Sequence, residues 1–281
     1  MRRKVLLVMR RDVLQSRRDQ TLLGLGVAFL LLTAVTAFVQ QLLHSPYAPP
    51  LTTDETIFAG GSLLSILGPL VVLVATYGAV LNERASGAVR FTLGLPVSRA
   101  TVYAGKYLGR IGIVLGTAIV GFAVATAVVL LTYPTVYLGQ YLLFGVVTLL
   151  YAVVWVGFGL SISGTFSSVT RGVAALVGVF VVFRLGWMGV QMVGLRLAEA
   201  SVYRDTPAWY FLLGRINPMN AYVRVSNELM VEPERYHPLL THPGNVETVW
   251  VSAEFSFAVL VVWAVVAPLF GYVRFGRADL D

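Results

Sequence analysis

The residue types that perform enzymatic chemistry are sparse in this 281-residue sequence, and their spacing matches no catalytic motif. A glycine-rich stretch with serines spans residues 157–164, but it has no nearby histidine or acid to activate a nucleophile. His237 and His242 lie close together, yet two loop histidines are too few for a metal site, and there is no His-Glu-x-x-His. The absence of cysteine excludes disulfides and thiolate metal sites. We expect no catalytic residue, no metal site and no cofactor in this chain.

Charged residues that could bind a partner gather in the 25-residue segment 82–106, NERASGAVRFTLGLPVSRATVYAGK. Pro96 ends any first helical turns, and Ser98 can cap a new helix. A simple connector between two helices needs only about 2–8 residues. This one is longer and carries apolar side chains between basic residues, which favours a docking element for a soluble partner. The alternative is a loop that lies on lipid headgroups.

The elements that position this segment are apolar helices. Hydrophobic residues make up 57% of the chain and charged residues 12%, and the mean hydropathy is +0.77. Uncharged stretches of 18 or more residues are long enough to cross about 30 Å of hydrocarbon as a helix. Alternation typical of strands is absent, so an all-α integral membrane protein with six transmembrane helices is predicted. The six predicted spans are approximately 21–41, 57–81, 107–131, 141–165, 172–195 and 252–273.

The distribution of Lys and Arg predicts the orientation of these spans. Seven basic residues lie in the first 20 positions and more lie in 82–110, whereas 44–56 and 132–140 have none. By the positive-inside rule, both termini and 82–106 are cytoplasmic, and 196–249 is extracytoplasmic. The N-terminal residues are either an interfacial helix, with Val5, Leu6, Met9 and Val13 on one side, or a simple positive anchor. We expect a multi-pass protein of the plasma membrane.

The soluble segments also limit what the chain can do alone. A nucleotide-binding domain needs about 100 residues or more, and no predicted cytoplasmic segment approaches that length. Gly105-Lys106 is followed by Tyr107 and does not complete a Walker A motif. If ATP is used, another chain must bind it. Nucleic acid is not an expected partner, because the basic residues are scattered beside spans without an aromatic reading surface.

Small and kinking residues occur within the spans. Gly105, Gly109, Gly112 and Gly116 recur at a spacing that lets helices approach closely, and packing within the chain is favoured over a dimer seam. Pro69 is expected to kink the second span.

Three groups of residues together resemble permease subunits of ATP-binding-cassette exporters, in the branch that includes nitrous-oxide-reductase maturation permeases. One group is Asn217-Pro218 with Ala221-Tyr222, and another is the ending from Gly271 to Leu280. The third group lies within the 82–106 segment: Glu83, Arg84, Ser86, Gly87, Arg90, Leu93, Leu95, Pro96, Ser98, Arg99, Gly105 and Lys106.

The resemblance implies a membrane-spanning permease, without enzymatic activity of its own, that works with a separate cytoplasmic ATPase holding ATP and Mg²⁺. Such permeases pair as homodimers or heterodimers, and a coupling helix between spans two and three docks on the ATPase. On this resemblance, the ATPase-coupling residues are Glu83, Arg84, Gly87, Arg90, Pro96 and Arg99. A second cytoplasmic contact would include Ser168 and Arg171.

Arg184 is the one charge deep within a predicted span. Arg184 could line the translocation path or pair with an acid such as Glu254. Alternatively, the helix breaks at residues 184–186 and the side chain extends toward the membrane boundary. We favour the break, because Gly186 and Gly189 weaken the helix nearby. The alternatives to the permease are a secondary transporter that does not use ATP and a non-transporting scaffold. A secondary transporter is expected to carry paired acids within its spans, which this sequence lacks.

Overall fold

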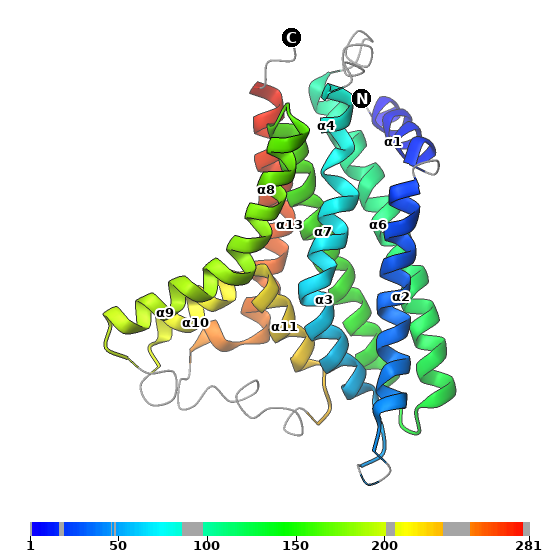
Figure 1. Cartoon of the computed structure of the whole chain (residues 1–281), viewed down its shortest axis with the longest axis vertical. Coiled ribbons are helices and arrows are strands. Elements are labelled where there is room, and N and C mark those ends of the chain that lie inside the picture. Colours follow the sequence, from blue (N-terminus) through cyan, green and yellow to red (C-terminus); the bar gives the residue numbers. More distant parts are fainter. Residues whose placement is uncertain are drawn as a thin grey trace.

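Six long apolar helical stretches run between the two ends of the molecule in the part of the chain that the structure describes (Figure 1). The computed structural model describes residues 2–16, 20–45, 47, 49–85, 98–200, 206–232 and 248–277. No β-strand occurs among these residues, so the predicted all-α membrane fold is confirmed. The stretches are formed by α2 (Gln20–Leu43), α3 (Thr53–Thr76) with α4 (Gly78–Ala85), α6 (Arg99–Thr132), α7 (Leu138–Thr165), α8 (Val169–Val181) with the π-helical turn η1 (Val182–Gly186) and α9 (Trp187–Leu197), and α13 (Ala253–Arg277).

The helix α7 forms the centre of this bundle. It packs along α13 and α3, and also contacts α6. Trp155 and Tyr141 of α7 are among the largest fully buried side chains. The helices α2 and α6 lie side by side, and α1 (Arg2–Ser16) packs on α6 (Figure 1). The apolar faces of α6, α8, α9 and α13 that point away from α7 remain exposed, as expected for helices in contact with lipid.

Figure 1 places α1, α4 and the last turns of α13 at one end of the bundle, which we call the basic end. The basic side chains of this end include Arg99, Lys106, Arg110, Arg274 and Arg277. The helix α6 starts here, and its N-cap is Ser98, whose Oγ accepts the Thr101 amide at 3.2 Å. The cap predicted at Ser98 is therefore confirmed. The third span begins eight residues before the predicted 107, because capping and propensity extend the helix into the polar region.

Two prolines within the spans leave backbone carbonyls that side chains from other helices satisfy. Pro69 has no N–H to donate to Ser65 O, and the Tyr151 hydroxyl of α7 donates to that carbonyl at 2.8 Å. Pro268 of α13 likewise frees Ala264 O, to which the Tyr107 hydroxyl donates at 3.4 Å. Such substitutes are needed because lipid offers no hydrogen bonds to a free carbonyl.

The predicted extracytoplasmic segment 196–249 contains α10 (Ala208–Ile216), α11 (Pro218–Glu228) and the start of the 3-10 turn η3 (Val249–Val251). The helix α11 packs between α3, α7 and α13 rather than lying over their ends (Figure 1). Tyr222 is fully buried and stacks on Tyr151, with ring centroids 4.2 Å apart. Asn217 caps α11 by accepting the Met219 amide at 2.9 Å and donates to Phe183 O at 2.6 Å. The helix α11 is thus part of the bundle core.

Candidate functional site

Three of the six predicted coupling residues fall on the two helix ends that flank the undescribed positions 86–97. Glu83 and Arg84 lie in the last turn of α4, and the structure describes the side chain of Glu83. Arg99 is the first residue of α6, and its Nη1 donates to Gly276 O of α13 at 3.0 Å. Gly87, Arg90 and Pro96 lie outside the described residues.

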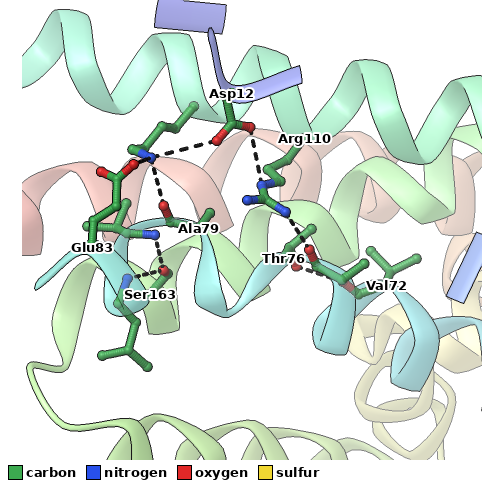
Figure 2. Close-up of polar contacts among 11 residues, drawn as sticks. Asp12, Val72, Thr76, Ala79, Glu83, Arg110 and Ser163 are labelled. Atoms are coloured by element: carbon green, nitrogen blue, oxygen red, sulfur yellow. Dashed lines mark hydrogen bonds and ion pairs between the residues drawn. The ribbon is translucent and has the colours of Figure 1, made fainter. Parts of the chain in front are cut away.

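A buried cluster of four charged side chains joins these two helix ends to α1 (Figure 2). Lys106 Nζ of α6 lies 2.8 Å from Glu83 Oε1 of α4 and 3.6 Å from Asp12 Oδ1 of α1. Arg110 Nε, one turn further along α6, lies 3.2 Å from Asp12 Oδ2. The side chains of Lys106 and Asp12 are each 5% exposed. We call Asp12, Glu83, Lys106 and Arg110 the ion cluster.

The ion cluster contains two carboxylates and two cations, so its formal charges cancel. Burial raises the pKa of the Asp12 carboxyl, and this effect outweighs the lowering of its pKa by Arg110 and Lys106. Removing one partner of such a cluster leaves an uncompensated buried charge, which typically costs about 3–5 kcal/mol. The cluster therefore fixes the positions of α1, α4 and α6 relative to one another.

Close backbone packing brings α1 to the ion cluster. A Cβ on Gly105 would lie 2.6 Å from the Cβ of Val8, and one on Gly109 would lie 2.8 Å from Asp12 Oδ2. The prediction of packing within the chain is therefore confirmed for these two glycines. Among the described residues, no atom outside α6 lies within 4 Å of a Cβ built on Gly112 or Gly116.

The contact face of α1 differs in part from the predicted apolar stripe, of which Val5, Met9 and Val13 are half-buried and Leu6 is exposed. Val8 and Asp12, which lie outside that stripe, face α6. The difference arises because a buried ion pair and two glycines determine the docking, and apolar spacing alone does not reveal them. Sequence analysis missed Asp12 and Arg110. One indication was available in the spacing of Val8 and Asp12, which matches the four-residue spacing of Gly105 and Gly109.

The predicted second contact lies in the connection between α7 and α8. Ser168 is the N-cap of α8 without a side-chain cap hydrogen bond, and Arg171 in the first turn is exposed. The helix α4 packs on both α7 and α8, which brings this connection near the ion cluster.

Arg184 lies in the π-helical turn η1 and is exposed. The Trp187 amide donates to Val182 O, five residues back, and the helix continues into α9. The helix break that we favoured at residues 184–186 is therefore wrong, because a widened turn accommodates the glycine-weakened region without ending the helix. Such turns occur frequently at functional sites.

Comparison with known proteins agrees with the membrane-spanning architecture. A family model for ABC-2 family transporter proteins matches residues 6–280, so the chain belongs to this family. It is therefore a multi-pass membrane permease subunit of an ATP-binding-cassette transporter.

Two curated relatives place the chain within the branch that its sequence resembles. It is 26% identical over 220 residues to the probable ABC transporter permease protein NosY of Stutzerimonas stutzeri, with 76% of this chain and 78% of that protein covered. The NosY protein of Pseudomonas aeruginosa is 25% identical over the same length and the same shares of the two chains. The predicted resemblance to these permeases is confirmed.

Proposed function

We propose that this chain exports a substrate across the plasma membrane, driven by a separate cassette ATPase that docks on 82–106 and holds ATP and Mg²⁺. The observation that carries the proposal is the contact of Lys106 with Glu83 at 2.8 Å. It joins the helix that leads into the segment to the helix that leads out of it. A force applied to the segment would therefore move α4 and the start of α6 together.

The ion cluster gives this movement a route into the bundle. Asp12 ties α1 to Lys106 and Arg110, so α1 would move with the start of α6. Arg99 is joined to Gly276 near the end of α13, which links the same region to the last span. Basic residues of the segment, including Arg84 and Arg90, would face acidic or polar groups of the ATPase. Ser168 and Arg171 would form the smaller second contact.

Arg184 supports a translocation path at the exposed face of α8, η1 and α9. An arginine near the middle of a span costs at least about 2.5 kcal/mol if it faces lipid. Its exposed position on η1 therefore favours water or a second protein chain as its environment. We propose that two permease copies, identical or different, pair with Arg184 lining the path between them.

The docking proposal is tested by purifying the permease with its ATPase after the double substitution Arg90→Glu and Arg99→Glu. We expect at least about a tenfold loss of ATPase binding, because reversing two charges removes attraction and adds repulsion. The measurement is the amount of ATPase retained by immobilised permease, together with the rate of ATP hydrolysis in proteoliposomes.

The matched control is Arg196→Glu with Arg204→Glu, which makes the same change in charge in the segment proposed to lie outside. It should leave ATPase binding intact. Undiminished binding and hydrolysis in the Arg90 and Arg99 double variant would contradict docking on 82–106. Equal losses in both double variants would attribute the effect to net charge and would also contradict it.

A further inference from the structure

The regular helical hydrogen bonding of the second span is interrupted close to the basic end, although Tyr77 keeps right-handed helical dihedral angles (φ −59°, ψ −30°). The helix α3 ends at Thr76, α4 begins at Gly78, and Tyr77 lies between them. The Thr76 hydroxyl bonds back to Val72 O at 2.7 Å within α3. Residues beyond the division lead directly to Glu83 of the ion cluster and to the segment 82–106.

One hydroxyl of α7 holds the backbone amides on the far side of this division. Ser163 Oγ accepts the amide of Val80 at 2.7 Å and the amide of Leu81 at 3.0 Å (Figure 2). In a continuous α-helix these two amides would donate to the carbonyls of Thr76 and Tyr77. Ser163 is fully buried, so water does not compete for them.

Two basic side chains of α6 hold carbonyls around the same division. Arg110 Nη1 donates to Ala75 O at 2.9 Å, and Lys106 Nζ donates to Ala79 O at 2.7 Å (Figure 2). Ala75 precedes the division and Ala79 follows it. The two sides are thus joined through side chains of α6 as well as through the chain itself.

Close packing keeps α7 next to the division. A Cβ on Gly159, one turn before Ser163, would overlap Thr76 Oγ1, so only glycine permits this approach. A Cβ on Gly172 of α8 would lie 2.4 Å from the side chain of Leu81. The hydroxyl of Ser163 is therefore held at one place along the second span.

We infer that Ser163 is a positioning residue that keeps the second span divided at Tyr77, so that α4 acts as a hinged arm between 82–106 and the bundle. The inference rests on the proposed function for the role of α4 in coupling. Side-chain hydrogen bonds can exchange partners without breaking a helix, and this suits a joint that must bend repeatedly. Without Ser163, the amides of Val80 and Leu81 would donate to the carbonyls of Thr76 and Tyr77, and α3 and α4 would join into one continuously hydrogen-bonded helix.

The test uses spin labels, because the chain has no cysteine and needs no background substitutions. Labels are placed at Asn82→Cys on α4 and Gly276→Cys on α13, both exposed positions. Electron–electron distances are measured in the full-length permease in lipid nanodiscs, alone and in complex with its ATPase and ATP. In Ser163→Ala we expect the distance in the permease alone to shift by about 2 Å or more.

Two further variants make the comparison specific. Ser161→Ala removes another buried α7 hydroxyl, which bonds to Ala267 of α13 instead, and should leave the distance unchanged. Gly78→Ala keeps Ser163 but favours a continuous helix, because alanine has the higher helix propensity. The three atoms nearest its Cβ all belong to the side chain at position 82, and the variant should shift the distance in the same direction as Ser163→Ala. If Ser163→Ala does not fold, the distance in Gly78→Ala alone tests whether the interruption at Tyr77 sets the position of α4.

Kinetics separate positioning from a purely structural role. In the complex, Ser163→Ala should lower the maximal rate of ATP hydrolysis by about threefold or more with KM for ATP unchanged, since ATP binds another chain. An unshifted distance in Ser163→Ala and Gly78→Ala, or an equal shift in Ser161→Ala, would overturn the inference. If ATP fails to change the distance in the wild-type complex, the proposed function is contradicted, while the permease alone still decides the role of Ser163.

Discussion

Lys106 shows how a buried charge can be accommodated at the edge of a membrane. Its ammonium group has three N–H donors, and it meets Glu83, Asp12 and Ala79 O, within hydrogen-bond or ion-pair distance. Burying a charge is costly unless it is paired and hydrogen-bonded, and this arrangement provides both. The second cation, Arg110, completes the balance against the two carboxylates. A single residue thus connects three helices.

Replacing Lys106 with methionine should destabilise the protein markedly. Lys106→Met keeps the volume but leaves Glu83 without this partner and Asp12 with Arg110 alone. We expect a loss of about 3–5 kcal/mol in the free energy of unfolding, measured as a fall in Tm in detergent. Adding Glu83→Gln should recover part of the loss, since it removes one of the two buried carboxylate charges that Lys106 faced.

The control for this prediction is Arg171→Met, which removes an exposed cation and should change stability by less than about 0.5 kcal/mol. A Tm in Lys106→Met equal to that of Arg171→Met would show that the ion cluster does not stabilise the fold.

At the scale of helices, glycines and hydroxyls decide which pairs meet. Gly105 and Gly109 give α1 its place on α6, while a Cβ on Gly112 or Gly116, at the same spacing, would meet no described residue outside α6 within 4 Å. Tyrosine hydroxyls of α6 and α7 donate hydrogen bonds to the backbone carbonyls that prolines leave free in α13 and α3, respectively. Helices in lipid associate through such close packing and hydrogen bonding, because lipid removes the hydrophobic drive between them.

Gly105→Leu should therefore detach α1, and Gly112→Leu should not. A side chain at position 105 overlaps Val8, whereas a Cβ at position 112 meets no atom outside α6 within 4 Å among the described residues. We expect trypsin to cleave after Arg10 and Arg11 at least about tenfold faster in Gly105→Leu than in the wild type, since exchange between docked and free α1 exposes these bonds. Time courses of limited proteolysis measure the rates. Equal cleavage of the two variants would contradict docking through Gly105.

Tyr151 and Pro69 should behave as a coupled pair in a double-mutant cycle. Tyr151→Phe removes the donor to Ser65 O and should cost about 1–3 kcal/mol. In a Pro69→Ala background the new amide at position 69 can donate to the same carbonyl, so Tyr151→Phe should cost less. Thermal unfolding of the four proteins gives the coupling energy. If the unfolding free-energy costs of the two substitutions are additive, the Tyr151 hydroxyl does not compensate for the hydrogen bond that Pro69 cannot make.

For the whole molecule, polar ties hold both ends of the bundle. At the end opposite α1, Asp54 Oδ2 at the start of α3 accepts the amides of Val231 and Glu232, at 2.9 and 2.8 Å. The hydroxyl of Tyr133 donates to Ala37 O at 2.9 Å and also bonds to Thr56. The region between these ties and the ion cluster is largely apolar and carries the exposed Arg184. We therefore expect each end of the bundle to move as a unit, with the changes in helix packing in the apolar region between the two ends.

The orientation of this arrangement is tested by cysteine accessibility. Asn82→Cys and Tyr47→Cys place single thiols at exposed positions of opposite ends, and Tyr47 is 98% exposed. By the positive-inside rule, a membrane-impermeant maleimide should label Tyr47→Cys in intact cells and Asn82→Cys only after permeabilisation. Labelling of Asn82→Cys in intact cells would reverse the orientation and would contradict an ATPase docked at the basic end.

The sequence by itself determined the six apolar helices and the Ser98 cap, because span length, hydropathy and capping depend on neighbouring residues. It also singled out the segment around Glu83 and Arg99 by its unusual length and charge. Only the tertiary structure decided that Asp12 and Lys106 share an ion cluster, that Ser163 holds amides of α4, and that the fifth span continues through Arg184. Those features depend on helices that are distant in sequence or on turn geometry, and the local pattern of residues specifies neither.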